Sequence, residues 1–76
     1  MKANLKLTAV FEEQKEGGYI GYVEEIAGVN TQGETLDETR DNLAEALVLV
    51  LDTHRQLISE SLKGKKVIRE NIDFTA

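Results

Sequence analysis

One long helical pattern limits the folds that this sequence can adopt. From Leu36 to about Ser61, apolar residues recur three, four or seven positions apart, which predicts an amphipathic helix with one face suited to a sheet. Thr35 and Glu38 have the spacing of a capping box, so the helix should begin directly after Thr35. Gly64 predicts its end. The main stripe is formed by Leu36, Leu43, Leu47, Val50, His54 and Leu57.

Short alternating segments flank this helix and predict strands. Three of them precede it, at residues 5–11, 19–26 and 29–34, and one follows it at residues 66–74. Gly21 lies inside the second segment and indicates either a bulge or a close approach to the backbone. The predicted fold is α+β with the order β-β-β-α-β. With the fourth strand beside the first, the sheet order is 3-2-1-4 and the long helix crosses one face.

The opposite face of such a sheet has no second helix to cover it. A chain of 76 residues without cysteine forms one domain of marginal stability, because little surface is buried and no disulfide is available. We therefore expect a homodimer or a higher homo-oligomer. The apolar residues expected at this interface are Val10, Ile20, Tyr22 and Val67.

Acidic residues are concentrated in one part of the chain. The segment from Glu12 to Asp41 holds nine of them against two basic residues, Lys15 and Arg40. This charge repels phosphate backbones, so direct binding of nucleic acid is not expected. The segment is either a solvated surface that keeps the protein soluble, or a surface that attracts a basic protein partner.

The sequence offers little for catalysis or membrane insertion. Glu24 and Glu25 are adjacent on a strand, so their side chains should point to opposite faces and cannot share one metal. His54 has no second histidine or cysteine beside it, and the glycines lack the spacing of a phosphate loop. We expect no catalytic residue, no cofactor and no metal. The longest apolar run is too short to span a membrane and there is no signal peptide, which favours a cytoplasmic protein.

A longer motif points to a family. The stretch "GGYIGYVEEIAGVNTQGETLDETRDNLAEALVLVLD" strongly resembles the HicB-like antitoxin family, formerly an uncharacterised family of short bacterial and archaeal chains. The resemblance extends from residue 5 to residue 74. Ala27 and Val29 depart from the usual proline and cysteine of the family. The residues that match are Gly18, Tyr19, Tyr22, Glu24, Gly28, Thr31, Gly33, Thr35, Leu36, Ala44 and Ala46.

The resemblance implies a partial RNase H-like fold and an antitoxin that neutralises a HicA-type toxin, which is a basic protein that binds and cleaves RNA. Some members carry a further DNA-binding segment, but here we expect one domain over residues 1–76 without it. The alternative is a solitary homo-oligomeric binding domain without a toxin partner. The residues expected to contact a partner are Glu24, Glu25, Asn30, Gln32, Glu34 and Asp37.

Overall fold

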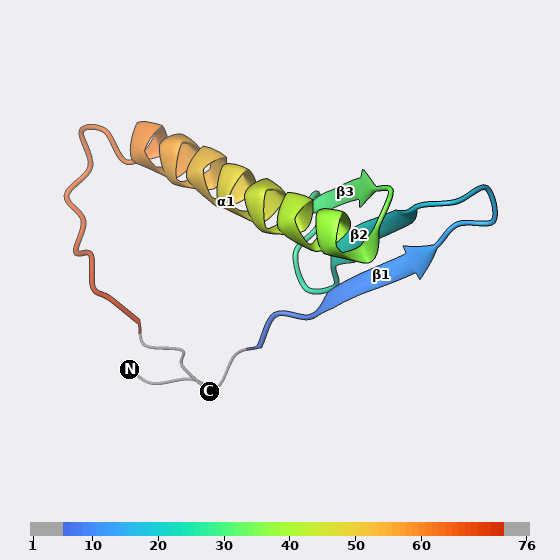
Figure 1. Cartoon of the computed structure of the whole chain (residues 1–76). Helices are drawn as coiled ribbons and strands as arrows, with labels where there is room; N and C mark the ends of the chain where they lie inside the picture. The colour runs from blue at the N-terminus through green and yellow to red at the C-terminus, as the bar shows by residue number, and fades with distance from the viewer. Residues whose placement is uncertain (1–5, 73–76) are drawn as a thin grey trace.

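The computed structural model describes residues 6–72 and contains three strands followed by one helix (Figure 1). The strands are β1 (Ala9–Glu13), β2 (Tyr19–Val23) and β3 (Asn30–Gly33), and the helix is α1 (Leu36–Ser61). They form one antiparallel sheet in the order β1-β2-β3, with α1 packed on one side. The predicted α+β class and the three-stranded meander are confirmed. No helix in residues 6–72 is long and apolar enough to cross a membrane.

The start of α1 lies where the sequence predicts it. Thr35 has an extended backbone, and its hydroxyl accepts a hydrogen bond from the amide of Glu38 at 3.1 Å. This bond satisfies one of the amides that have no partner inside the helix. Asp37 and Glu38 occupy the first turn, where negative charge is favoured by the helix dipole. The capped start places the helix directly after β3 and fixes its direction across the sheet.

The helix lies very close to the sheet because two glycines make room for it. Thr39 is fully buried, and a Cβ atom placed on Gly33 would lie 2.6 Å from its hydroxyl and 2.9 Å from its amide nitrogen. A Cβ on Gly21 would lie 3.0 Å from the Thr39 methyl and 3.1 Å from the Phe11 ring. Of the two possibilities for Gly21, close approach is therefore the one realised.

The hydrophobic core is small and lies at one end of α1. Val23, Val29 and Leu43 are the buried apolar side chains among residues 6–72, and half-buried residues up to Val50 pack around them. Beyond Val50, every residue of α1 is exposed. At 1.5 Å per residue, about 16 Å of helix projects past the core. Figure 1 shows this second half of α1 extending away from the strands.

The predicted fourth strand is not formed in the described part of the chain. After the helix, Gly64 turns the backbone with a positive φ of 75°, and residues 65–72 have no strand partner. The reason is the length of α1, because the chain leaves the helix far beyond the sheet edge that the strand was expected to join (Figure 1). In the described residues the sheet therefore has three strands, and the predicted order 3-2-1-4 lacks its fourth strand. The first strand begins at Ala9, later than predicted, while Leu5 and Phe74 lie outside the described residues.

Candidate functional site

The sheet face opposite α1 carries most of the predicted interface residues. Strand register places them in two rows across the three strands, and side chains in each row share one face because strand side chains alternate. We call these six residues the open face. They are Val10, Tyr22 and Asn30 in one row, and Glu12, Ile20 and Gln32 in the other.

The open face is partly apolar and accessible. Ile20 is 37% exposed and Tyr22 is 36% exposed, although both are large apolar or aromatic side chains. Each is flanked across the strands by polar side chains, with Glu12 and Gln32 beside Ile20 and Asn30 beside Tyr22. An apolar centre with a polar margin is the usual composition of a protein-binding surface. The register thus joins two groups that the sequence treats separately, the expected oligomer residues and the expected partner contacts.

Glu24 and Glu25 follow β2 at one end of the open face, and they differ in their hydrogen bonding. The Glu24 amide donates to the Thr8 carbonyl at 2.9 Å, which extends the ladder between β1 and β2. The Glu25 carboxylate accepts two bonds of 2.7 Å, from the hydroxyl and from the amide of Thr8. These bonds lower the pKa of Glu25 below its usual value, the hydroxyl contributing most. Glu25 therefore secures the end of the hairpin, and Glu24 is the better candidate for a partner.

Glu34 lies at the other end of the open face. It lines a shallow depression of about 660 Å³ between the β1–β2 hairpin, the end of β3 and the start of α1. Three acidic residues and no basic residue line it, so the depression favours a cationic group. The lining residues are Gln14, Glu16, Gly17, Gly18, Tyr19, Ile20, Gln32, Gly33, Glu34 and Glu38.

Asp37 is outside this depression. Its carboxylate is 92% exposed and forms an ion pair of 2.8 Å with Arg40, one helical turn further along. The Arg40 guanidinium also lies 5.9 Å from the centre of the Phe11 ring. Asp37 therefore has a neighbouring positive charge of its own, which reduces its attraction for a second one.

The backbone edge of β3 is partly occupied. The side-chain amide of Asn42 on α1 donates to the main-chain carbonyl of Gln32 at 3.0 Å. The helix packs along β3 more extensively than along the other strands. The side chains of Asn30 and Gln32 remain on the open face, but the backbone edge of β3 is shielded by α1.

Val67 does not join the open face. It lies in the segment after α1 and is 47% exposed, while Val10, Ile20 and Tyr22 share two strands of the sheet. The sequence pattern groups Val67 with the others only if a fourth strand pairs with β1. That strand is absent from residues 65–72, so Val67 lies apart from Val10, Ile20 and Tyr22 in this structure.

No cluster of metal-binding side chains is found in the described residues. Among residues 6–72, no three histidine, aspartate or glutamate side chains are grouped to hold a metal ion. His54 is exposed on the projecting half of α1, beside the 27–28 turn.

Sequence reasoning missed three contributors to the site, Thr8 in one place and Glu16 with Glu38 in another. Thr8 holds Glu25 across 17 positions, and no local pattern reveals a contact of that kind. Glu16 and Glu38 line the same depression as Glu34, because this depression extends from the hairpin to the start of α1. The second group could have been anticipated from pairing β2 with β3, since Tyr19 opposes Gly33 and so brings the hairpin beside Glu34.

Comparison with known proteins places the chain in a family. It is 36% identical to a UPF0150 protein of Synechocystis sp. over 72 residues, which cover 95% of this chain and 96% of the relative. It is 44% identical over 46 residues to one of Thermotoga maritima, covering 59% and 61%, and 28% identical over 64 residues to one of Archaeoglobus fulgidus, covering 84% and 93%. No solved structure matches the chain. Residues 2–54 match the UPF0150-like family, and the chain belongs to that family.

Proposed function

We propose that this protein is a HicB-like antitoxin that binds and neutralises a HicA-type toxin by direct protein contact. The toxin would be basic and would cleave mRNA, and the antitoxin would cover its RNA-binding surface. The proposal includes no enzymatic activity, no cofactor, no direct contact with nucleic acid or membrane, and a cytoplasmic location. The open face is the observation that carries it.

The composition of the open face supports a protein partner. Ile20 and Tyr22 provide an accessible apolar centre, and Glu24 and Glu34 add negative charge at its two ends. A basic partner would bury the apolar centre and place its cations near both ends. Charge at the margin acts mainly on the rate and orientation of encounter, while the buried centre provides most of the affinity.

The experiment that tests this proposal is neutralisation of a toxin. The reading frame next to the gene would be expressed with and without this chain, and growth and complex formation would be measured. We expect the chain to restore growth and to co-purify with the toxin in a complex that weakens as salt is added. Absence of a toxin-like neighbour, together with absence of any co-purified basic protein, would reject the proposal.

Matched variants identify the surface. Tyr22→Asp and Ile20→Asp should abolish toxin binding, because each places a charge at the apolar centre. Glu24→Lys and Glu34→Lys should mainly slow association, and their effect should diminish at high salt. Asp52→Lys provides the control, because this substitution makes the same change of charge on the projecting half of α1, away from the open face. Equal losses in the control and the open-face variants would contradict the assignment.

The alternative is a solitary homo-oligomeric binding domain without a toxin partner. The observation that favours it is the imbalance between three buried apolar side chains and many large exposed ones among residues 6–72. A protein of this kind would form a stable oligomer through the open face, and Tyr22→Asp would then dissociate it.

The finer fold assignment is also a proposal. A partial RNase H-like sheet of order 3-2-1-4 needs a fourth strand beside β1. Residues 66–74 keep the sequence pattern of that strand although residues 66–72 are unpaired here.

A further inference from the structure

The projecting half of α1 and the segment after it extend beyond the hydrophobic core. We call residues 51–72 the arm. On α1 the inward stripe continues past the core as His54, Leu57 and Ile58, because these residues lie on the same helical face as Leu43. Leu57 is 63% exposed and Ile58 is 56% exposed. The helix thus carries an apolar face well beyond the sheet that the face is suited to cover.

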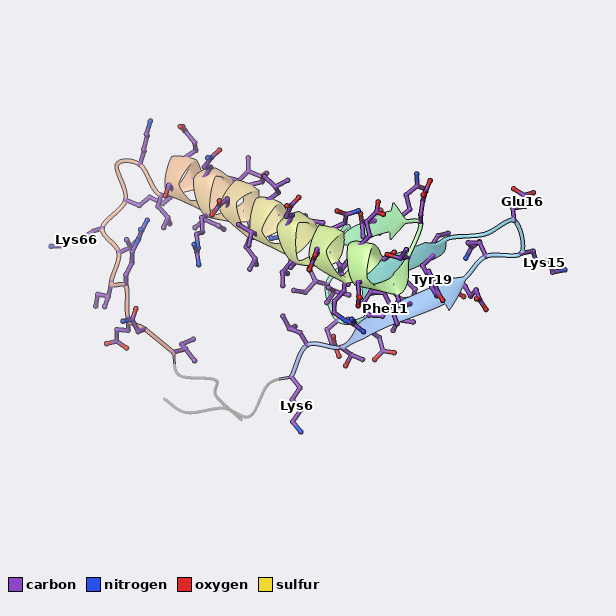
Figure 2. All side chains as sticks on the ribbon, viewed as in Figure 1. Lys6, Phe11, Lys15, Glu16, Tyr19 and Lys66 are labelled. Carbon is purple, nitrogen blue, oxygen red and sulfur yellow. The ribbon has the colours of Figure 1, made fainter. Side chains whose placement is uncertain are left out.

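The end of the arm has the sequence pattern of a strand but no partner strand. Val67, Ile68 and Ile72 are exposed apolar side chains in a segment without regular secondary structure, and Ile68 is 89% exposed. Ile68 and Ile72 are four positions apart, so in a strand their side chains would lie on the same face and make that face apolar. Figure 2 shows Lys66 at one extreme of the molecule and the hairpin residues Lys15 and Glu16 at the other.

The sheet has a backbone edge that would accept such a strand. The bonds from Glu24 to Thr8 and from Gln14 to Gly18, both 2.9 Å, show that the even-numbered residues of β1 bond toward β2. The amides and carbonyls of Ala9, Phe11 and Glu13 therefore point away from β2. No residue in the 6–72 range pairs with them, since β1 ends the sheet. The edge of β3 is different, because Asn42 and α1 shield it.

The inner face beside β1 is also incompletely covered. Helix α1 packs over β3 and β2 but only marginally over β1. Ala9 and Glu13 are exposed there and Phe11 is half-buried, although all three side chains are on the helix side of the sheet. A second helix segment packed on this region would contact both Phe11 and any strand added at the β1 edge.

Electric charge favours the same pairing. Residues 62–72 contain four basic residues and one acidic residue, whereas residues 9–25, which hold β1 and β2, contain five acidic residues and one basic residue. Opposite charges of this kind steer two surfaces together and set their orientation. Within one chain, Lys66 in the basic stretch lies at the opposite end of the molecule from Lys15 and Glu16 in the hairpin (Figure 2).

From these observations we infer that two copies of this chain exchange arms. Residues 66–72 of one copy add a strand to the β1 edge of the other, and Leu57 and Ile58 of the same arm cover the region around Phe11. The occupant of the edge is a second copy because the complementary strand, apolar helix face and charge all belong to this chain. The exchange completes a four-stranded sheet in each copy and does not depend on toxin binding.

Disulfide trapping tests the exchange directly, because the chain has no cysteine. A chain with Glu13→Cys or Ala9→Cys on β1 would be mixed with a chain carrying Glu70→Cys, which lies on the same side of the arm as Ile68 and Ile72, and the mixture oxidised. We expect covalent heterodimers between the two chains. Mixing the β1 variants with Glu45→Cys, an exposed position on the first half of α1, is the control and should give few. Equal trapping in the control would overturn the inference.

A second measurement uses the native thiol-free protein. Sedimentation equilibrium should show a dimer that weakens with salt, and Ile68→Asp should weaken it at least about tenfold, since it places a charge in the exchanged strand. Helix content by circular dichroism should be retained in this variant, because Ile68 is remote from the core. A monomeric wild-type chain, or a dimer that Ile68→Asp leaves intact, would overturn the inference. The disulfide experiment can also be done with one chain that carries both cysteines. Disulfides that form only within that chain, and never between two chains, would likewise overturn the inference.

Discussion

The close contact between α1 and the sheet predicts a large effect from one added methyl group. In Gly33→Ala the new Cβ would lie 2.6 Å from the Thr39 hydroxyl, 2.9 Å from its amide nitrogen and 3.1 Å from its Cα. Two of these atoms are backbone, so relief requires the helix itself to move. Thr39 is fully buried and its hydroxyl donates to the Thr35 carbonyl at 2.7 Å, next to the helix cap.

The expected magnitude follows from two opposing effects. Overpacking of this kind destabilises a protein by about 1–3 kcal/mol. Alanine also restricts the unfolded chain, which returns about 0.4–1 kcal/mol at a position with an ordinary backbone conformation. A net loss of about 1–2 kcal/mol remains, or about 5–15 °C in Tm for a domain of this size. Urea unfolding followed by circular dichroism would measure it at a fixed protein concentration, since association also shifts stability.

Gly21→Ala provides the matched comparison. Its Cβ would meet side-chain atoms only, the Thr39 methyl at 3.0 Å and the Phe11 ring at 3.1 Å. Thr39→Ser removes that methyl but keeps the hydroxyl, so it should recover part of the loss in Gly21→Ala and little of the loss in Gly33→Ala. A neutral Gly33→Ala, or equal recovery in both double variants, would refute the reasoning about the helix contact.

Three further predictions concern stability. Thr35→Ala removes the helix cap and should cost about 1 kcal/mol in unfolding free energy, whereas Thr35→Ser should cost much less, as urea midpoints would show. Leu43→Ala should cost about 2–5 kcal/mol because its side chain is 4% exposed in the core, and Leu49→Ala, at a position 66% exposed, should change the thermal midpoint little. The Thr8 bonds lower the folded-state pKa of Glu25 below its unfolded value, so their contribution is present above the unfolded pKa and is lost as pH falls through the folded one. The difference in urea midpoint between wild type and Glu25→Gln should accordingly shrink on acidification, and a difference that stays constant with pH would contradict this role.

The helix and the three-stranded meander could be predicted because their signals are local. Thr35 and Glu38 mark the helix start through three residues of sequence, and alternation marks β1 and β2 without reference to the rest of the chain. The placement of Val10, Ile20 and Tyr22 on one face also follows from alternation, once β1 and β2 are paired.

The remaining features depend on contacts that no local pattern contains. The bond between Thr8 and Glu25 joins residues 17 positions apart, and the Asn42 amide reaches Gln32 only because α1 runs along β3. The fourth segment has a strand pattern, but a pattern of period two does not say which sheet edge will pair with it, or whether that edge belongs to the same copy or to another copy of the chain. Likewise the apolar stripe of α1 does not reveal that packing against the core ends at Val50.

The unequal support along α1 has a consequence for its local unfolding. The amides of the first half can exchange with solvent only when the packed end around Leu43 opens, whereas the last three turns have helix hydrogen bonds and no tertiary cover in a single copy. Amide exchange along this one helix should therefore fall into two regimes with a boundary near Val50. Any molecule that occupies the outer turns would be detected as slowed exchange there, in residues that otherwise report only fraying.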